Sequence, residues 1–332
     1  MSLEDNITLT RLLARLSMPA TRTPSNVREQ RDASTPSGAV VDLYEPRGRP
    51  RGAVVAIHGV TVNGGKDERL VHFARSLSAV GVACAVPTLP RLAACQWEPS
   101  DVDVLGEVFD LLENRTSRRP GLVGFSHGAS YALVLASRDE YRERTRFVLA
   151  FGPYLDLNEV LRDYTKQEAP DPADAEAVDN WIYLRFVLAL GIGERAGLTG
   201  EVAPALATMM GRYCHEASVA EKQSFFRKNI APLDVLQVAQ RLHSPDVLAA
   251  VSPVGKLDRV LCPVSLVHDV HDGVVPPEHS RRIHEELQRR GLDRKQTLLL
   301  TRLLSHVALR DALRLGELGR LLKALRPIVL AG

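Results

Sequence analysis

Short apolar runs alternate with segments of helical periodicity along much of this chain, and this alternation constrains the fold more than any other feature. The run GAVVAIHG at 52–59 precedes a segment at 67–81 in which Leu70, Phe73 and Leu77 recur at helical spacing. Further runs and helical segments alternate at 82–89, 99–115, 121–125, 127–140 and 146–154. Such alternation is typical of βαβ units. The sequence therefore predicts an α/β protein with a doubly wound, mainly parallel sheet.

The alternation stops after residue 155, and helical patterns without strand patterns follow. It resumes with runs and helical segments at 263–269, 276–291, 295–303 and about 307–326. We expect a core of residues 38–155 and 252–332, interrupted by an all-helical cap at 156–251. Residues 1–37 are expected to form an N-terminal arm, because 19–37 are polar and rich in Pro and Ser. The runs at 38–46 and 52–59 are expected to be neighbouring strands.

Composition excludes several classes of partner. The 332 residues carry a formal net charge of +2 and no long basic block, so a nucleic-acid partner is not expected. No apolar run approaches a membrane span, and Glu4 and Asp5 stand where an export signal needs positive charge. The cysteines are widely spaced, which favours reduced thiols in the cytoplasm over zinc or a disulfide framework: Cys84, Cys95, Cys214 and Cys262.

The stretch Gly124-Phe125-Ser126-His127-Gly128 has the pattern G-x-S-x-G. At average glycine and serine usage, a chain of this length would contain the pattern by chance roughly 0.1 times. Here an expected strand precedes Ser126 and an expected helix follows it, which is the context of a nucleophile elbow. Ser126 is therefore a candidate nucleophile.

A serine hydroxyl needs a base to take its proton and a third group to orient that base. Asp272 follows the expected strand at 263–269, and His306 follows the one at 295–303. Because the carboxyl ends of parallel strands gather at one edge, Ser126, Asp272 and His306 can converge there. Backbone amides of Val60 or Thr61, after the run at 52–59, and of His127 could stabilise an oxyanion.

The sequence resembles the serine type of α/β-hydrolase in its G-x-S-x-G motif at Ser126 and in the chain order of Ser126, Asp272 and His306. The resemblance covers 38–155 and 252–332, whereas 156–251 is similar only to the variable helical cap of that family. It implies that Ser126 is the nucleophile, His306 the general base and Asp272 the orienting acid, with the amides of Val60 and His127 as the oxyanion hole. Asp269 and Asp156 are alternative acids.

The function implied is hydrolysis of a small carboxylic ester or thioester with an apolar acyl part, through an acyl-enzyme. The same triad would serve an amidase, a peptidase or an acyltransferase, and a non-catalytic binding protein of the same fold is the alternative from another class. No cofactor or metal is expected, because the loop of His268, Asp269, His271 and Asp272 has spacing that suits a metal ion poorly.

The cap contains a nearly all-apolar run at 181–190, WIYLRFVLAL. We expect this run to form the core of the cap, although it could instead line an acyl pocket or a homodimer contact. An apolar substrate pocket between cap and core is a further hypothesis, motivated by five aromatic residues: Trp181, Tyr183, Phe186, Phe225 and Phe226.

Overall fold

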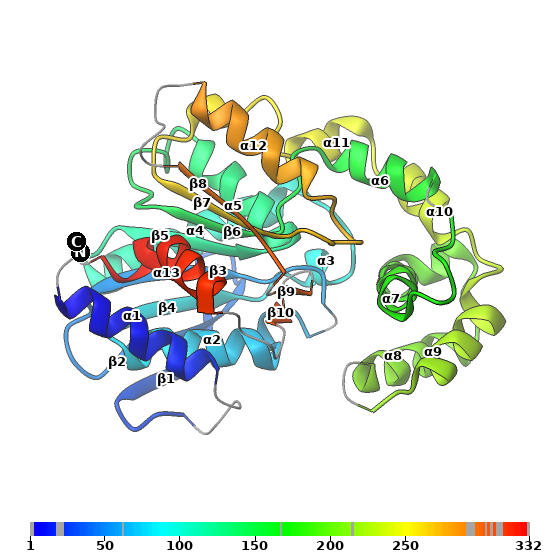
Figure 1. The fold of residues 1–332 in the computed structure, drawn as a ribbon, viewed down its shortest axis with the longest axis horizontal. Helices are drawn as coiled ribbons and strands as arrows, with labels where there is room; N and C mark the ends of the chain where they lie inside the picture. The colour runs from blue at the N-terminus through cyan, green and yellow to red at the C-terminus, as the bar shows by residue number, and fades with distance from the viewer. Residues whose placement is uncertain are drawn as a thin grey trace.

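An eight-stranded, mainly parallel sheet runs through the centre of the protein (Figure 1). The computed structural model describes residues 3–17, 23–61, 63–166, 168–213, 216–289, 296–302, 304–305, 308–309 and 315–330. The strands are β1 (Val27–Ser34), β2 (Val40–Pro46), β3 (Gly52–Ile57), β4 (Val82–Pro87), β5 (Pro120–Phe125), β6 (Val148–Phe151), β7 (Val264–Asp269) and β8 (Gln296–Thr301). Their spatial order is β1-β2-β4-β3-β5-β6-β7-β8, and every pair from β4 to β8 is parallel. The predicted α/β class and mainly parallel sheet are confirmed.

The expectation that β2 and β3 are neighbours is wrong. β4 lies between them, antiparallel to β2 and parallel to β3. The crossover through α2 (Glu68–Ala79) carries the chain from β3 to β4, and α2 packs on β4. The apolar runs identified both strands correctly, but a run alone carries no information about which strand it pairs with.

Residues 1–37 differ from the arm expected ahead of the folded body. β1 is the edge strand of the sheet, paired antiparallel with β2, and α1 (Leu3–Leu16) buries Leu9 and Leu12 against the core. The sequence VREQRDAS of β1 has no apolar alternation, so its strand pattern is hidden. Backbone pairing and the ion pairs Arg31–Asp42 at 2.6 Å and Arg75–Glu29 at 2.7 Å hold it.

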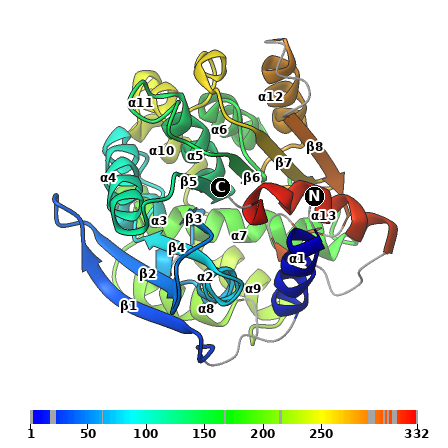
Figure 2. The same cartoon turned by 90° about the vertical axis from the view of Figure 1, so that its left-hand side faces the viewer.

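Helices cover both faces of the sheet (Figures 1 and 2). On one face lie α1, α2 and α13 (Leu315–Val329), whose apolar side chains pack in one core cluster. On the other face lie α4 (Pro99–Thr116), α5 (His127–Ser137) and α12 (Glu278–Gln288), whose apolar residues belong to a second cluster. A sheet buried on both faces explains why its central strands are continuous apolar runs.

Residues 156–251, between β6 and β7, contain helices joined by turns and loops and no strand among those that the structure describes, and we call this segment the cap. Its helices are α6 (Leu157–Lys166), α7 (Ala175–Ile192), a 3-10 helix (Gly193–Ala196), α8 (Val202–Arg212), α9 (Val219–Phe225), a π-helical turn (Phe226–Ile230), α10 (Val235–Leu242) and α11 (Pro245–Ala250). In Figure 1 they lie at one end of the sheet, in green to yellow. Within the described ranges, no helix is both long and apolar enough to cross a bilayer.

The apolar run at 181–190 lies in α7 and forms the core of the cap, as expected. Phe186 is fully buried, and its ring centroid lies 5.6 Å from that of Phe225 and 5.8 Å from that of Tyr213. Five other apolar residues of the run are also buried: Ile182, Leu184, Val187, Leu188 and Ala189. Phe186 therefore holds the cap helices together instead of facing a substrate pocket.

Candidate active site

Ser126 lies at a sharp turn between β5 and α5. Its φ of 52° and ψ of −122° are strained for a residue with a side chain. The Ser126 amide donates to the Phe151 carbonyl at 2.7 Å, which continues the pairing of β5 with β6 up to the turn. The predicted strand–turn–helix context of G-x-S-x-G is confirmed, and the strain is typical of a nucleophile elbow.

Glycines let three backbone segments meet at this turn. A Cβ at Gly128 would collide with the carbonyl oxygens of Ile57 and His58, and a Cβ at Gly124 would collide with the start of α5. A Cβ at Gly59 would lie only 3.0 Å from Cβ of Ser126. The loop after β3 is therefore packed directly against the elbow, with backbone facing backbone.

His58 fixes the course of that loop. Its Nε2 accepts the Leu89 amide at 3.1 Å, so the neutral ring carries its proton on Nδ1, which donates to the Gly59 carbonyl at 2.7 Å. Burial lowers the pKa of His58 to about 4, which keeps the ring neutral. Gly59 and then Val60 follow, and the Val60 amide donates to no protein acceptor among the residues that the structure describes.

His127, the first residue of α5, is buried next to the serine. Its Nδ1 lies 3.4 Å from Oγ of Ser126. The imidazole stacks on Trp97 with ring centroids 5.6 Å apart and packs edge-on against Tyr154 at 5.1 Å. These contacts fix the His127 side chain, while its amide lies at the positive end of the helix dipole.

Trp97 connects this region to the cap. Its backbone amide donates to Nε2 of His243 at 3.2 Å, and the two rings lie 4.9 Å apart. His243 ends α10, and its Nδ1 contacts the Ala239 carbonyl at 3.2 Å. Sequence analysis did not identify Trp97 or His243, because neither residue belongs to a motif and their contact joins segments far apart in the chain.

Asp272 lies in the loop after β7, and its carboxylate is held by that loop. Oδ1 accepts the amides of Val274 at 2.8 Å and Val275 at 2.9 Å. Oδ2 lies 3.3 Å from Nε2 of His268, which is fully buried. The two backbone amides and His268 fix the orientation of the Asp272 carboxylate.

The two alternative acids differ in position. Asp269 ends β7, is buried, and accepts the His271 amide at 3.0 Å. Asp156 precedes α6, where its Oδ1 accepts the Asn158 amide at 2.9 Å. Asp156 therefore serves as a helix cap. Asp269 and Asp272 both lie at the carboxyl end of β7, so both remain candidates.

His306 lies outside the described residues, so the structure does not place it. The described residues on either side form a short antiparallel pair, β9 (Leu304–Ser305) with β10 (Ala308–Leu309). β9 contacts β7, the strand that Asp269 ends. β9, which ends at Ser305, thus lies beside the strand that carries the acid candidates.

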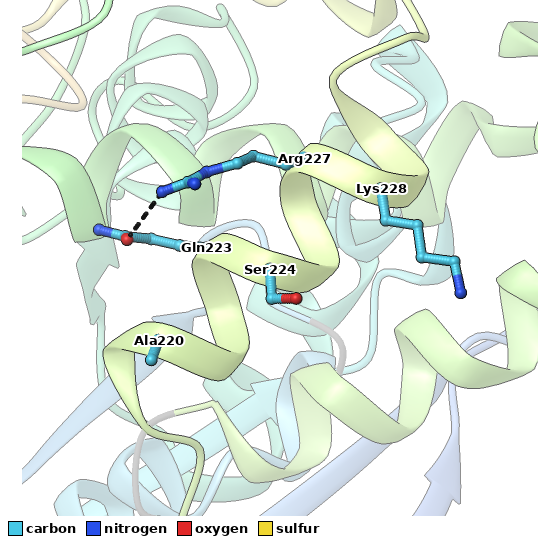
Figure 3. A pocket seen from close by; sticks show the side chains of 5 residues that line it. All are labelled: Ala220, Gln223, Ser224, Arg227 and Lys228. Atoms are coloured by element: carbon cyan, nitrogen blue, oxygen red, sulfur yellow. Dashed lines mark hydrogen bonds between the residues drawn. The ribbon is translucent and has the colours of Figure 1, made fainter.

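A hollow on the cap surface is lined by none of the residues predicted for the site (Figure 3). Its lining residues come from α9 and the π-helical turn: Ala220, Gln223, Ser224, Arg227 and Lys228. In Figure 3 the Arg227 side chain extends toward Gln223, one helical turn earlier, and donates to its side-chain oxygen at 3.3 Å. The lining residues include no histidine, carboxylate or thiol that could activate the Ser224 hydroxyl, so the hollow is not a candidate for catalysis.

No protein-family model and no curated protein matches the sequence. The fold is nevertheless similar to solved structures. One is an esterase of Pyrococcus furiosus, at 12% identity and a TM-score of 0.50, with 91% of each chain covered. Another is a 2,6-dihydroxy-pseudo-oxynicotine hydrolase, at 18% identity and a TM-score of 0.52, covering 93% of this chain and 69% of that one. The chain has the α/β-hydrolase fold.

Proposed function

We propose that the protein is a serine hydrolase that cleaves a carboxylic ester or thioester. The observation that carries this proposal is Ser126 in a strained turn between β5 and α5, packed against the loop after β3. Strain of this kind is retained where the surrounding structure imposes it, most often at functional sites. The likeness to a solved esterase and a solved hydrolase supports the same class.

In the proposed reaction Oγ of Ser126 attacks the carbonyl carbon of the ester while His306 takes the hydroxyl proton. The oxyanion that forms is stabilised by the amides of Val60 and His127. His306 then protonates the departing alcohol or thiol, which leaves an acyl group on Ser126. Water, deprotonated by His306, attacks the acyl-enzyme and releases the acid. Asp272 orients the imidazole, with Asp269 as the alternative acid.

Hydrolysis of p-nitrophenyl esters by the wild-type protein and by Ser126→Ala tests the proposal. We expect wild-type turnover and a loss of about 10⁴-fold or more in kcat for the variant, because the nucleophile is absent. Ser137→Ala is the matched control, since Ser137 is buried in α5 and its hydroxyl bonds only the Val134 carbonyl. Activity that survives Ser126→Ala would refute the proposal.

The same assay assigns the acid. Asp272→Asn keeps the size of the side chain but removes the charge that orients the base, and it is expected to lower kcat by about 10⁴-fold. Asp269→Asn should have a much smaller effect. If Asp269→Asn lowered kcat more than Asp272→Asn, the orienting role would be assigned to Asp269.

A further inference from the structure

Arg185 is the single charged residue in the apolar run of α7. The side chain is 7% exposed. Its neighbours three and four positions away are apolar, so the helix itself offers no carboxylate: Trp181, Ile182, Leu188 and Ala189. A buried guanidinium is costly unless an anion compensates it.

No hydrogen bond or ion pair joins the Arg185 guanidinium to a carboxylate among the described residues, and the charge of Asp234 acts on it only from longer range. Nη1 donates to the Trp181 carbonyl at 3.0 Å, and the guanidinium carbon lies 3.6 Å from the centroid of the Trp181 ring. Within the described part of the chain, no carboxylate approaches Arg185 to ion-pair distance. Burial lowers the pKa of Arg185 to about 10, so the group stays charged at neutral pH. Nε1 of Trp181 is also buried, and no described residue accepts a hydrogen bond from it.

Lys222 is a second buried cation of the cap, and it differs from Arg185 in its ion pairing. At 8% exposure it is as buried as Arg185. Its ammonium group contacts Oδ1 of Asp179 at 3.0 Å and lies 3.9 Å from the Tyr213 ring. Among the described residues, the cap therefore places a carboxylate against Lys222 but none within ion-pair distance of Arg185, although both side chains are buried to a similar degree.

Arg185 lies toward the side of the cap that borders the loop of Asp272. Burial, and then the nearby charge of Asp272, raise the pKa of Tyr164 of α6, whereas the charge of Arg185 lowers it. The Tyr164 hydroxyl donates to the Val274 carbonyl. α7 also approaches the core on this side, because a Cβ at Gly273 would lie 3.8 Å from Cβ of Asn180. In Figure 2, α7 crosses behind the sheet. Arg185 of the cap and Asp272 of the core thus both lie near Tyr164.

We propose that Arg185, together with Nε1 of Trp181, binds a carboxylate on the acyl part of the substrate. The proposal rests on the serine hydrolase function above and narrows its substrate to the monoester of a dicarboxylic acid, with an apolar chain between ester and carboxylate. Guanidinium groups suit carboxylates because their donors match the two oxygens. An indole N–H would add a neutral donor to the same site.

Hemiesters of increasing chain length test this inference. Mono-p-nitrophenyl esters of succinate, glutarate, adipate and suberate are compared with the p-nitrophenyl esters of unbranched acids of matched length. We expect the wild-type protein to prefer one hemiester over its neutral match. A hydrogen-bonded charge contributes about 1.5–3 kcal/mol, so Arg185→Gln should lower kcat/KM for that hemiester roughly 10- to 100-fold and leave the neutral ester within about twofold.

Two controls separate this role from a structural one. Arg185→Lys keeps the charge and should restore part of the preference, whereas Arg227→Gln removes an arginine from the cap surface and should leave it unchanged. Equal loss on both esters with Arg185→Gln, or no preference in the wild-type protein, would overturn the inference while leaving the hydrolase proposal intact. A wild-type protein inactive on all the esters, with Ser126 unreactive, would instead remove the hydrolase proposal.

Discussion

The elbow and the cap are built in different ways. Around Ser126, backbone packs against backbone, because Gly59, Gly124 and Gly128 have no side chains to keep the segments apart. The cap is held by side chains, chiefly the aromatic cluster around Phe186 and the paired cation Lys222. Backbone packing fixes the position of a nucleophile closely, whereas a surface made of side chains can change with few substitutions. The difference suggests that chemistry is set in the core and substrate choice in the cap.

Phe186→Ala should produce the largest loss of stability among the variants that test this comparison. Removing a fully buried ring leaves a cavity, and the cost is about 3–5 kcal/mol. Urea unfolding measures the loss. Because the elbow does not depend on this ring, the kcat of the folded variant on a small ester such as p-nitrophenyl acetate should stay near the wild-type value. A large fall in that kcat would show that cap packing also sets the elbow.

Gly128→Ala should disturb the elbow itself. The added methyl group meets the carbonyl oxygens of Ile57 and His58, which cannot rotate away, and overpacking of this kind costs about 3 kcal/mol. We expect both stability and esterase activity to fall. Gly211→Ala is the matched control, since Gly211 lies in α8 with open space around it, and alanine should stabilise that helix by up to about 1 kcal/mol. Equal behaviour of the two variants would contradict the backbone-packed elbow.

A smaller effect on stability is expected from Asp101, a buried acid of the core that can be compared with Arg185, a buried base of the cap. Its Oδ2 is buried without a partner among the described residues, and burial raises its pKa from 3.8 to about 6. The folded protein therefore holds a proton that the unfolded chain loses, so this group's contribution to stability falls as pH rises from about 4 to 6. Asp101→Asn has no carboxyl group at this position and therefore lacks this pH dependence. The free energy of unfolding of the variant minus that of the wild-type protein should thus increase by about 2–3 kcal/mol between pH 4 and pH 6.

Urea unfolding of both proteins at pH 4 and pH 7 measures this change. Asp103→Asn, in the same helix but with an exposed side chain, is the control. A constant difference between Asp101→Asn and wild type at the two pH values would contradict the assignment. The comparison with Arg185 is chemical: a buried carboxyl can become neutral near physiological pH, whereas a guanidinium cannot and needs an anion.

Sequence analysis predicted those helices and strands whose buried residues recur in a regular pattern along the chain. The central strands are apolar runs and α2, α4 and α5 follow helical spacing, so their positions agree with the prediction within a few residues. β1 was missed because an edge strand with polar side chains depends on its partner, and the place of β4 between β2 and β3 depends on pairing that no run encodes.

The candidate site was predictable to a similar degree. Ser126 was identified because its motif and its flanking strand and helix are local in sequence. The contact of Trp97 with His243 joins positions 146 residues apart, and no local pattern reports it. Arg185 was visible as a lone charge in an apolar run, but whether a carboxylate lies at ion-pair distance depends on every element packed around it.

The central claim is that Ser126 is an activated nucleophile, and a fluorophosphonate probe tests it most directly. The probe reacts with activated serine hydroxyls and leaves a mass increment that peptide mapping locates. We predict one increment per chain, on the peptide that contains Ser126, and none on Ser126→Ala. An unlabelled wild-type protein, or labelling that persists in Ser126→Ala, would contradict the account.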